Sequence, residues 1–144
     1  MRISVGRRRM TLGVTTVRSF TVHDPASGRS LTAWVNELGQ DVVVAVGGGQ
    51  GPHVGCVVLA QPQPAKGDPA WWAASCALLT VAPGKGVHIA RRGATRLAER
   101  CGRVAVVSAG VHDDGLDRQG IEDYLRLGEE LAEVVAEALG PRSG

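Results

Sequence analysis

Every second residue is apolar in much of the first half of the chain, and this period of two indicates β-strands. In one run, Leu31, Ala33 and Val35 alternate with residues of the opposite parity. Residues 42–46 differ, because they are apolar on both parities, as in a strand that is covered on both faces. Clusters of Pro, Gly and Asp separate the runs and are typical of turns. The pattern predicts strands over residues 14–22, 31–36, 42–46, 54–60 and 74–81.

In the second half the apolar positions recur every three to four residues, a spacing that indicates helices. One stripe covers residues 89–101 and is followed by Gly102, the residue type that most often ends a helix. Another covers residues 121–139 and follows Asp117, a good N-cap residue. The valine-rich run 103–109 between them predicts a sixth strand. The predicted order is β-β-β-β-β-α-β-α, without an internal repeat.

The connections predict how these elements pair. We expect the glycine-rich stretch 47–53 to join two antiparallel neighbours. The strand–helix–strand unit over residues 74–109 is long enough for a right-handed crossover, which makes its two strands parallel. The loops 82–88 and 110–116 then leave the same edge of the sheet, where open α/β sheets tend to bind ligands.

Histidines mark these loops. If strand 42–46 runs in the same direction as the crossover strands, His53, His88 and His112 converge at one edge of the sheet. His23 lies apart, at the end of the first predicted strand.

Size and charge limit the possible functions. A chain of 144 residues fits one domain, and a net charge of +2 argues against a dedicated nucleic-acid binder. No apolar run approaches the ~18 residues of a membrane span. No apolar segment follows the basic N-terminus, so we expect no secretory signal.

The ends of the chain differ from its middle. We expect residues 1–11 to be a flexible basic arm, residues 12–140 to form a single α/β domain, and residues 141–144 to be a disordered tail. The arginine run 7–9 is then solvated or, alternatively, contacts an anion or nucleic acid.

The cysteines indicate a reducing environment. Cys56, Cys76 and Cys101 are odd in number and widely spaced, and each lies in an apolar run. We expect all three to be buried as small hydrophobes, which is consistent with a cytoplasmic protein.

The glycine-rich loop has two interpretations. Consecutive N–H groups of Gly47, Gly48, Gly49 and Gly51 can form a concave nest for a phosphate or carboxylate. Alternatively, the glycines serve an ordinary hairpin loop that needs positive φ. The loop is neither a Walker A motif nor a Rossmann fingerprint, because no Gly-Lys-Ser/Thr and no helix follow it.

Two further loops carry candidate chemistry. His88 lies at a predicted helix start near Lys85, where an anion can bind, or it is only a polar neighbour of the helix cap. His112 is followed by Asp113 and Asp114, which can orient it as a base or join it as a metal ligand. The spacing of a metal motif and an exposed nucleophile for hydrolysis are both lacking.

Three segments in this order resemble the LpdD-like family, small proteins described as prenylated-flavin chaperones that accompany UbiD-type decarboxylases. They are residues 47–55 with Pro-His-Val-Gly, His88 at a helix start, and residues 110–116 with Gly-Val-His-Asp-Asp before a long helix. The resemblance covers about residues 12–139. It implies a mixed, mostly antiparallel sheet of about six strands with two helices on one face, as in proteasome-assembly chaperones, and often a homodimer.

The resemblance also implies a function. The chain would be a non-catalytic accessory protein that binds prenylated FMN or FMN and supports a UbiD-type decarboxylase or a flavin prenyltransferase. Trp71 and Trp72 would supply aromatic walls for the ring, or pack in the core. The residues assigned to cofactor binding are Gly47, Gly48, Gly49, Gly51, Pro52, His53, His88, Gly110, His112 and Asp114.

Two alternatives remain at this point. The chain is a pure interaction module, with the sheet or Trp71–Trp72 as its homodimer or partner interface and the motifs only fixing turns. Or it is a small enzyme that uses His112 and Asp114 as an acid–base pair.

Overall fold

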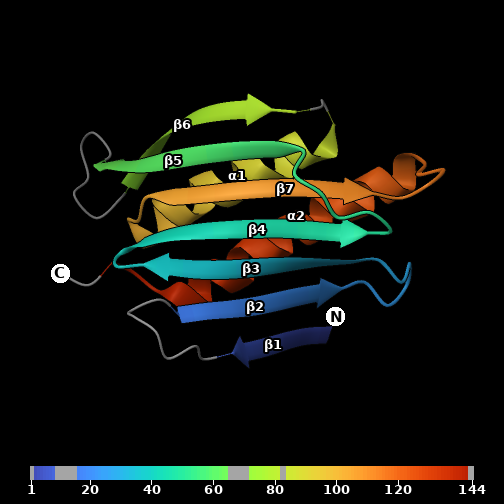
Figure 1. The fold of residues 1–144 in the computed structure, drawn as a ribbon, viewed down its shortest axis with the longest axis horizontal. Helices are drawn as coiled ribbons and strands as arrows, with labels where there is room; N and C mark the ends of the chain where they lie inside the picture. Colours follow the sequence, from blue (N-terminus) through green and yellow to red (C-terminus); the bar gives the residue numbers. More distant parts are fainter. Residues whose placement is uncertain (1, 9–15, 65–71, 82–83, 143–144) are drawn as a thin grey trace.

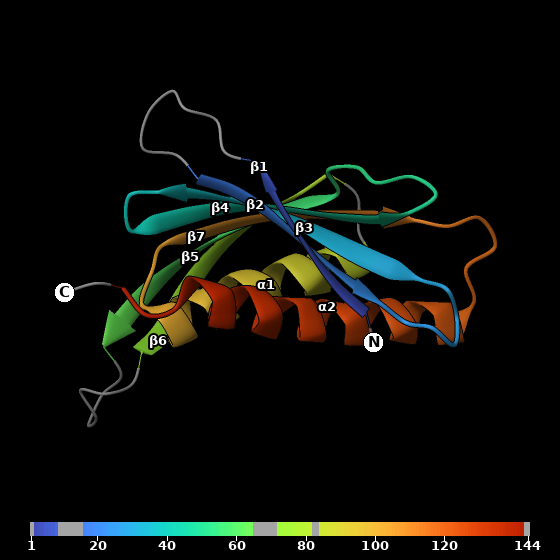
Figure 2. The ribbon, with the colours of Figure 1, turned by 90° about the horizontal axis from the view of Figure 1, so that it is seen from below.

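The computed structural model describes residues 2–8, 16–64, 72–81 and 84–142. Parts of the expectations above fall on residues 1, 9–15, 71, 82–83 and 143–144, which lie outside these ranges. Seven strands form one sheet, and two helices lie on one of its faces (Figures 1 and 2). The predicted architecture is confirmed, with one strand more than expected.

The sheet has the order β1-β2-β3-β4-β7-β5-β6. Only β4 and β7 pair in parallel, and the other neighbours are antiparallel. The strands are β1 (Arg2–Arg8), β2 (Thr16–His23), β3 (Ser30–Leu38), β4 (Asp41–Gly49), β5 (Cys56–Pro64), β6 (Trp72–Thr80) and β7 (Ala105–His112). The helices are α1 (Lys85–Cys101) and α2 (Arg118–Leu139).

Two expectations about pairing are corrected. β4 and β5 run in opposite directions, as predicted, but they are not neighbours, because β7 lies between them: Ser108 pairs with Ala45 on one side and with Val57 on the other. Residues 2–8 are not a free arm, because they pair with β2 along their whole length. The crossover strands β6 and β7 do run in the same direction, since both are antiparallel to β5.

The C-terminal segment also departs from its expectation. The N–H of Arg142 donates a hydrogen bond to the carbonyl oxygen of Cys101, at 2.8 Å. The chain therefore turns back onto the end of α1 after α2, and residue 142 is not part of a loose tail.

Helix ends follow the residues that the pattern picked out. Asp117 caps α2 by accepting a hydrogen bond from the N–H of Gly120 at 2.8 Å. Gly102 ends α1 in the left-handed conformation with φ of 62°. Between the helices, a Cβ on Gly128 would lie 3.1 Å from Ile89, so glycine lets α2 approach α1 closely.

The core lies between the sheet and the two helices. Leu31, Ala33 and Val35 of β3 point into it, together with one parity of each neighbouring strand and the apolar stripes of α1 and α2. β4 is covered on this side only, because Val43 is 37% exposed while Val42 and Val44 are buried. Its expected cover on both faces is therefore wrong.

The sheet face without helices, here called the open face, carries no charge at its central positions. The register of the strands places the same parity of each strand on this face. Its central side chains are Val17, Ser19, Thr21, Thr32, Trp34, Asn36, Val43, Ala45, Val57, Leu59, Ala77, Leu79, Val106 and Ser108. Several large ones are exposed, among them Trp34 at 44% and Leu59 at 39%.

Candidate functional site

The loops with the candidate chemistry meet at the carboxyl ends of the parallel pair β4 and β7. Residues 50–55 continue past β4 and lie against the end of β7. The N–H of Gln50 donates to His112 O at 2.8 Å, and the N–H of Gly55 donates to Ala109 O at 3.0 Å. Local pairing therefore holds the two motifs of the sequence side by side.

The glycines have a packing role here. Gly47, Gly48 and Gly49 belong to β4 and are paired with β7 on one side. A Cβ on Gly48 would lie 2.6 Å from the carbonyl oxygen of Ser30, and one on Gly110 would lie 1.9 Å from that of His53. Of the two interpretations, the geometry favours close backbone approach, with positive φ needed at Gly49 (72°).

The amides of the loop are already used. Besides those of Gln50 and Gly55, the N–H of Gly51 donates to His112 O at 3.1 Å and the N–H of His53 donates to Gly110 O at 3.4 Å. An anion nest at this loop would need these groups free. The structure therefore offers an anion no nest among them.

A hollow of about 200 Å³, here called the histidine hollow, lies beside this loop. His53 and His112 line it from the two motif loops, and Lys85 lines it from the start of α1. His53 Nδ1 is 2.9 Å from Gly51 O, and His112 Nε2 is 3.0 Å from Asp114 Oδ1. Its lining residues are His53, Gly55, Gly84, Lys85, Gly86, Gly110, Val111 and His112.

The start of α1 gives the histidine hollow a positive end. The N-cap residue Gly84 supplies no side-chain cap, and the first turn contains no acidic residue. Uncapped N–H groups and the helix dipole favour an anion, and the ammonium group of Lys85 adds to them.

The structure brings together only some of the assigned residues. His53, Gly110 and His112 line the histidine hollow. His88 is exposed on α1 and does not line it, so the expected convergence holds for two histidines of three.

The remaining assigned residues lie around these. Pro52 packs beside Gly47, where a Cβ on the glycine would lie 2.9 Å from the proline Cβ. Gly51 lies beside His112, because a Cβ added to this glycine would be 3.5 Å from the histidine Cβ.

Trp72 does not supply a wall of the histidine hollow. Trp72 begins β6, and its ring lies against Gly102, 2.8 Å from where a Cβ on that glycine would be. Gly102 follows the last residue of α1, and seventeen residues of helix span about 25 Å. Trp72 is therefore far from Lys85 and from the histidine hollow.

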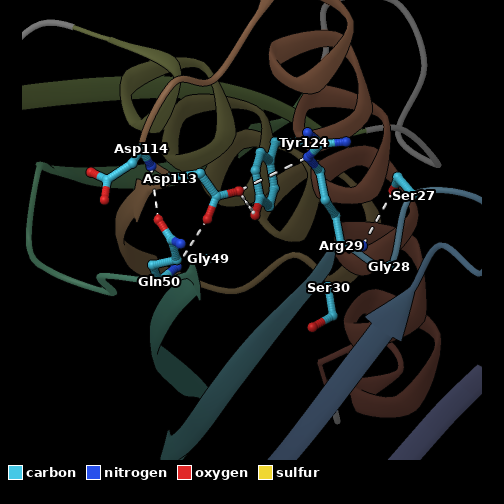
Figure 3. Close-up of a pocket in the computed structure, with 9 residues that line it drawn as sticks. All are labelled: Ser27, Gly28, Arg29, Ser30, Gly49, Gln50, Asp113, Asp114 and Tyr124. Atoms are coloured by element: carbon cyan, nitrogen blue, oxygen red, sulfur yellow. Dashed lines mark hydrogen bonds and ion pairs between the residues drawn. The ribbon is translucent and has the colours of Figure 1, made fainter.

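A second and larger hollow, here called the polar hollow, was not expected from the sequence. It has a volume of about 430 Å³ and lies between the β2–β3 turn, the end of β4, the loop after β7 and α2 (Figure 3). Its lining residues are Ser27, Gly28, Arg29, Ser30, Gly49, Gln50, Asp113, Asp114 and Tyr124.

The carboxylate of Asp113 connects two walls of the polar hollow, α2 and the loop after β4. Its Oδ2 accepts a hydrogen bond from the Tyr124 hydroxyl at 2.5 Å, and its Oδ1 accepts one from the N–H of Gln50 at 2.9 Å. Gln50 also accepts a hydrogen bond from the N–H of Asp114 at 2.8 Å through its Oε1. One carboxylate and one amide thus fasten the two motif loops to α2.

The surroundings shift two pKa values. Burial alone would raise the pKa of Asp113, but the hydrogen bonds from Tyr124 and Gln50, with the positive charges of Arg29 and Lys85, outweigh it and lower that pKa. Burial, followed by the hydrogen bond to the Asp113 carboxylate, raises the pKa of Tyr124 far above its ordinary value. The pair therefore consists of a carboxylate and a neutral phenol.

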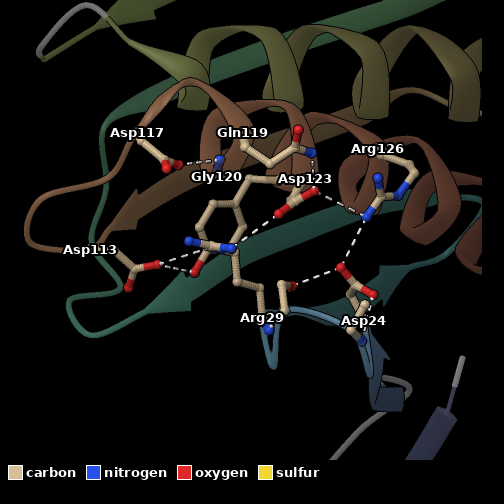
Figure 4. Close-up of polar contacts among 11 residues, drawn as sticks. Asp24, Arg29, Asp113, Asp117, Gln119, Gly120, Asp123 and Arg126 are labelled. Atoms are coloured by element: carbon tan, nitrogen blue, oxygen red, sulfur yellow. Dashed lines mark hydrogen bonds and ion pairs between the residues drawn. The ribbon is translucent and has the colours of Figure 1, made fainter.

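Arg29 connects this pair to a charge network on α2 (Figure 4). Its Nη1 donates to Asp123 Oδ2 at 3.0 Å, and its guanidinium lies over the Tyr124 ring, 6.0 Å from the ring centre. Arg126 links Asp123 to Asp24 of the β2–β3 turn, at 3.3 and 3.0 Å. Neither a turn arginine nor an acid inside a helix stands out by spacing, which is why the sequence did not indicate this network.

The structure also places the cysteines and the possible metal ligands. No group of three or more metal-ligating side chains comes together among them. Cys56 and Cys101 are buried, and burial raises the pKa of both thiols. Cys76 is exposed on β6, contrary to expectation.

The fold and these hollows define a class: a mixed α+β domain with its polar loops at the end of its parallel strand pair. A family model described as the prenylated flavin chaperone LpdD-like domain matches residues 26–140. The chain belongs to this family. No curated protein matches it.

Among the solved structures similar to this chain is that of a chaperone complex for yeast 20S proteasome assembly. It shares 11% identity over 83% of this chain and 99% of that chain, with a TM-score of 0.38, which is too distant to support an inference. Neither helix of the described ranges is long and apolar enough to cross a membrane.

Proposed function

We propose that this protein is a non-catalytic accessory protein that binds a flavin mononucleotide-type cofactor, prenylated FMN or FMN, and supports a UbiD-type decarboxylase or the flavin prenyltransferase. The supporting observation is the histidine hollow. Two imidazoles from the family motifs and Lys85 surround it at an uncapped helix start. Membership of the prenylated flavin chaperone LpdD-like family supports the cofactor class.

The histidine hollow fits part of such a cofactor. Its volume of about 200 Å³ is below the roughly 300–1,000 Å³ of sites that enclose a small molecule. It fits a phosphate group beside Lys85, or one polar edge of the ring. A carrier that releases its cofactor to a partner needs only such partial cover, because complete burial would slow the release.

Each residue then has a role that its chemistry allows. Lys85 and the N–H groups at the start of α1, which has no side-chain cap, hold the phosphate. His53 and His112 bind the polar edge of the ring, and Asp114 orients His112 through its hydrogen bond at 3.0 Å. Gly110 contributes by letting the His53 segment approach β7.

Calorimetric titration with FMN and, under anaerobic conditions, with prenylated FMN tests this proposal. We expect saturable binding of at least one form near micromolar, or about −8 kcal/mol. Binding should be lost in the His53→Ala/His112→Ala variant and retained in His23→Ala, which removes an imidazole elsewhere. Lys85→Ala should weaken the binding of FMN but leave the binding of riboflavin, which lacks the phosphate, unaffected. Absence of binding by both forms, together with unchanged decarboxylase maturation, would refute the proposal.

A second candidate function is an interaction module that acts as a homodimer, and the open face favours it. A face with exposed Trp34 and Leu59 and no charged central residue is unusual for a solvated sheet. A second copy offers the same uncharged surface, so two open faces can meet without burying an unpaired charge. This candidate is compatible with cofactor binding, because the histidine hollow lies at the end of the strands.

A further inference from the structure

The polar hollow has the volume of a ligand site but not its usual lining. About 430 Å³ lies within the range of small-molecule sites, which are mostly apolar. None of its nine lining residues carries an aliphatic side chain, and its one aromatic residue, Tyr124, is 1% exposed. The hollow is therefore unsuited to a flat aromatic ring and suited to a hydrophilic molecule.

The charges in the polar hollow disfavour a simple ion. One guanidinium, that of Arg29, faces two carboxylates, those of Asp113 and Asp114. An anion would meet the carboxylates, and a cation would meet the guanidinium. A neutral ligand avoids both penalties.

Donors and acceptors both line this hollow. Arg29 Nε has no hydrogen-bond partner within the described parts of the chain and lies 3.9 Å from Asp113 Oδ2, but it is fully buried, so Arg29 contributes positive charge to the wall and no donor that a ligand can reach through this atom. Asp114 is 88% exposed, and one of its oxygens is bonded to His112, which leaves the other as an acceptor. The side-chain amide of Gln50 and the hydroxyl of Ser30 add donors and acceptors.

We propose that the polar hollow binds a neutral polyhydroxylated group, a sugar alcohol or the polyol segment of a larger molecule. Each hydroxyl both donates and accepts, so neighbouring hydroxyls can accept from the side-chain amide of Gln50 or the hydroxyl of Ser30 and donate to Asp114. The two hollows share no lining residue. Because the hydrogen bond between His112 and Asp114 joins the two hollows, binding at each is followed through the signals of its own lining residues.

Nitrogen–proton correlation NMR of the full chain, titrated with ribitol, tests this proposal. A ligand of this size should bind with a dissociation constant of about 1 mM. We expect saturable shifts confined to Gly28, Ser30, Gln50 and Asp114. The same titration with inorganic phosphate should leave these signals in place. No saturable shift with ribitol, or shifts with phosphate alone, would overturn the proposal.

Matched variants locate the binding. The Gln50→Ala/Ser30→Ala variant should bind ribitol at least tenfold more weakly. Gln63→Ala/Ser75→Ala removes the same residue types from the β5–β6 hairpin, where they bond each other at 3.1 Å, and should have no effect. Equal weakening by both variants would overturn the assignment.

The chemical-shift changes that ribitol causes in the unsubstituted protein locate its binding site without any substitution. In the His53→Ala/His112→Ala variant, ribitol binding should persist. Titration with FMN distinguishes the sources of the polyol: shifts in the polar hollow indicate the ribityl chain of the cofactor, and their absence indicates a free polyol.

Discussion

At the scale of single residues, the functional end of the molecule depends on Asp113. It lies between the two motif residues His112 and Asp114, but its carboxylate points to Tyr124 and Gln50 instead of the histidine hollow. A buried hydroxyl of α2 thereby sets the position of a surface loop. Spacing along the sequence singles out His112 and Asp114 readily, whereas the partner of Asp113 is eleven residues away on another element and has no local signal.

Tyr124→Phe removes one hydrogen bond to a charged group, and we expect it to lower the free energy of unfolding at pH 7 by about 2 kcal/mol. The pKa of Asp113 is lowered in the fold, so its stabilising contribution is present above its unfolded pKa near 4 and is lost as the pH falls through the folded pKa. The difference between the two proteins should therefore shrink below about pH 4. Urea denaturation from pH 7 to pH 3 measures this.

Asp113→Asn is the control for this prediction. It keeps the shape of the side chain but removes the titrating group, so its stability should change less between pH 5 and pH 3 than that of the parent protein. A constant difference between Tyr124→Phe and the parent at every pH would show that the hydroxyl contributes without the charge of Asp113.

At the scale of elements, the helices are joined by their apolar stripes and, at the rim, by charges. Arg92 of α1 donates to Glu129 of α2 at 2.8 Å, and one turn further Arg96 and Arg100 both pair with Glu133. All of these side chains are 40–55% exposed. Exposed pairs contribute little, so the helix contact depends mainly on packing.

Glu133→Gln tests whether the ion pairs contribute little to the contact between α1 and α2 compared with apolar packing. Hydrogen bonds from Arg96, with the nearby positive charges, lower the pKa of Glu133, so the pairs persist down to mildly acidic pH. Because the pairs are solvated, we expect a loss of about 0.5–1 kcal/mol at low salt, which disappears near 1 M salt, where the Debye length is about 3 Å. Thermal unfolding at both salt concentrations measures this.

Glu137→Gln serves as the reference substitution on the same helix, because Glu137 is exposed and has no ion pair within the described ranges. It should change the melting temperature little at either salt concentration. A salt-independent loss in Glu133→Gln would contradict the view that these charges act only at the solvated rim.

The elements themselves were largely predictable, because each depends on local periodicity. The stripes of both helices, the cap at Asp117 and the end at Gly102 follow from residue spacing alone. The order of the strands does not. Nothing in residues 42–60 indicates that a strand made fifty residues later will separate β4 from β5.

The two hollows also differ in how far the sequence could predict them. Histidines in predicted loops pointed to the histidine hollow on the condition that strand 42–46 runs in the same direction as the crossover strands, and the parallel pairing of β4 with β7 meets that condition. The polar hollow combines a turn, a strand end and the side of a helix. Such a site is a product of tertiary packing, which periodicity does not report.

At the scale of the whole molecule, one side of the sheet is covered and the other is open. Five central strands spaced about 4.8 Å apart and about 30 Å long give the open face roughly 700 Å², close to the ~800 Å² per partner of a standard interface. Its size and lack of charge agree with the proposed homodimer.

We expect the protein to sediment as a dimer, and Leu59→Lys/Val43→Lys to convert it to a monomer, because two ammonium groups would be buried without partners in the interface. Ile121→Lys is the matched control, since Ile121 of α2 is also 39% exposed but lies away from the open face. Sedimentation velocity measures the outcome. A monomeric parent protein, or dissociation by Ile121→Lys as well, would contradict this interface.

The position of β7 in the sheet has a consequence for synthesis on the ribosome. β4 and β5 emerge before β7, so each leaves the exit tunnel with an inner edge that has no partner. Their opposite directions permit a provisional hairpin between them, which β7 must then separate. The inner edges of β4 and β5 therefore lack β7 as a partner until residue 112 has been added. Chaperones that shield strand edges would act during this interval, before β7 enters the sheet between β4 and β5.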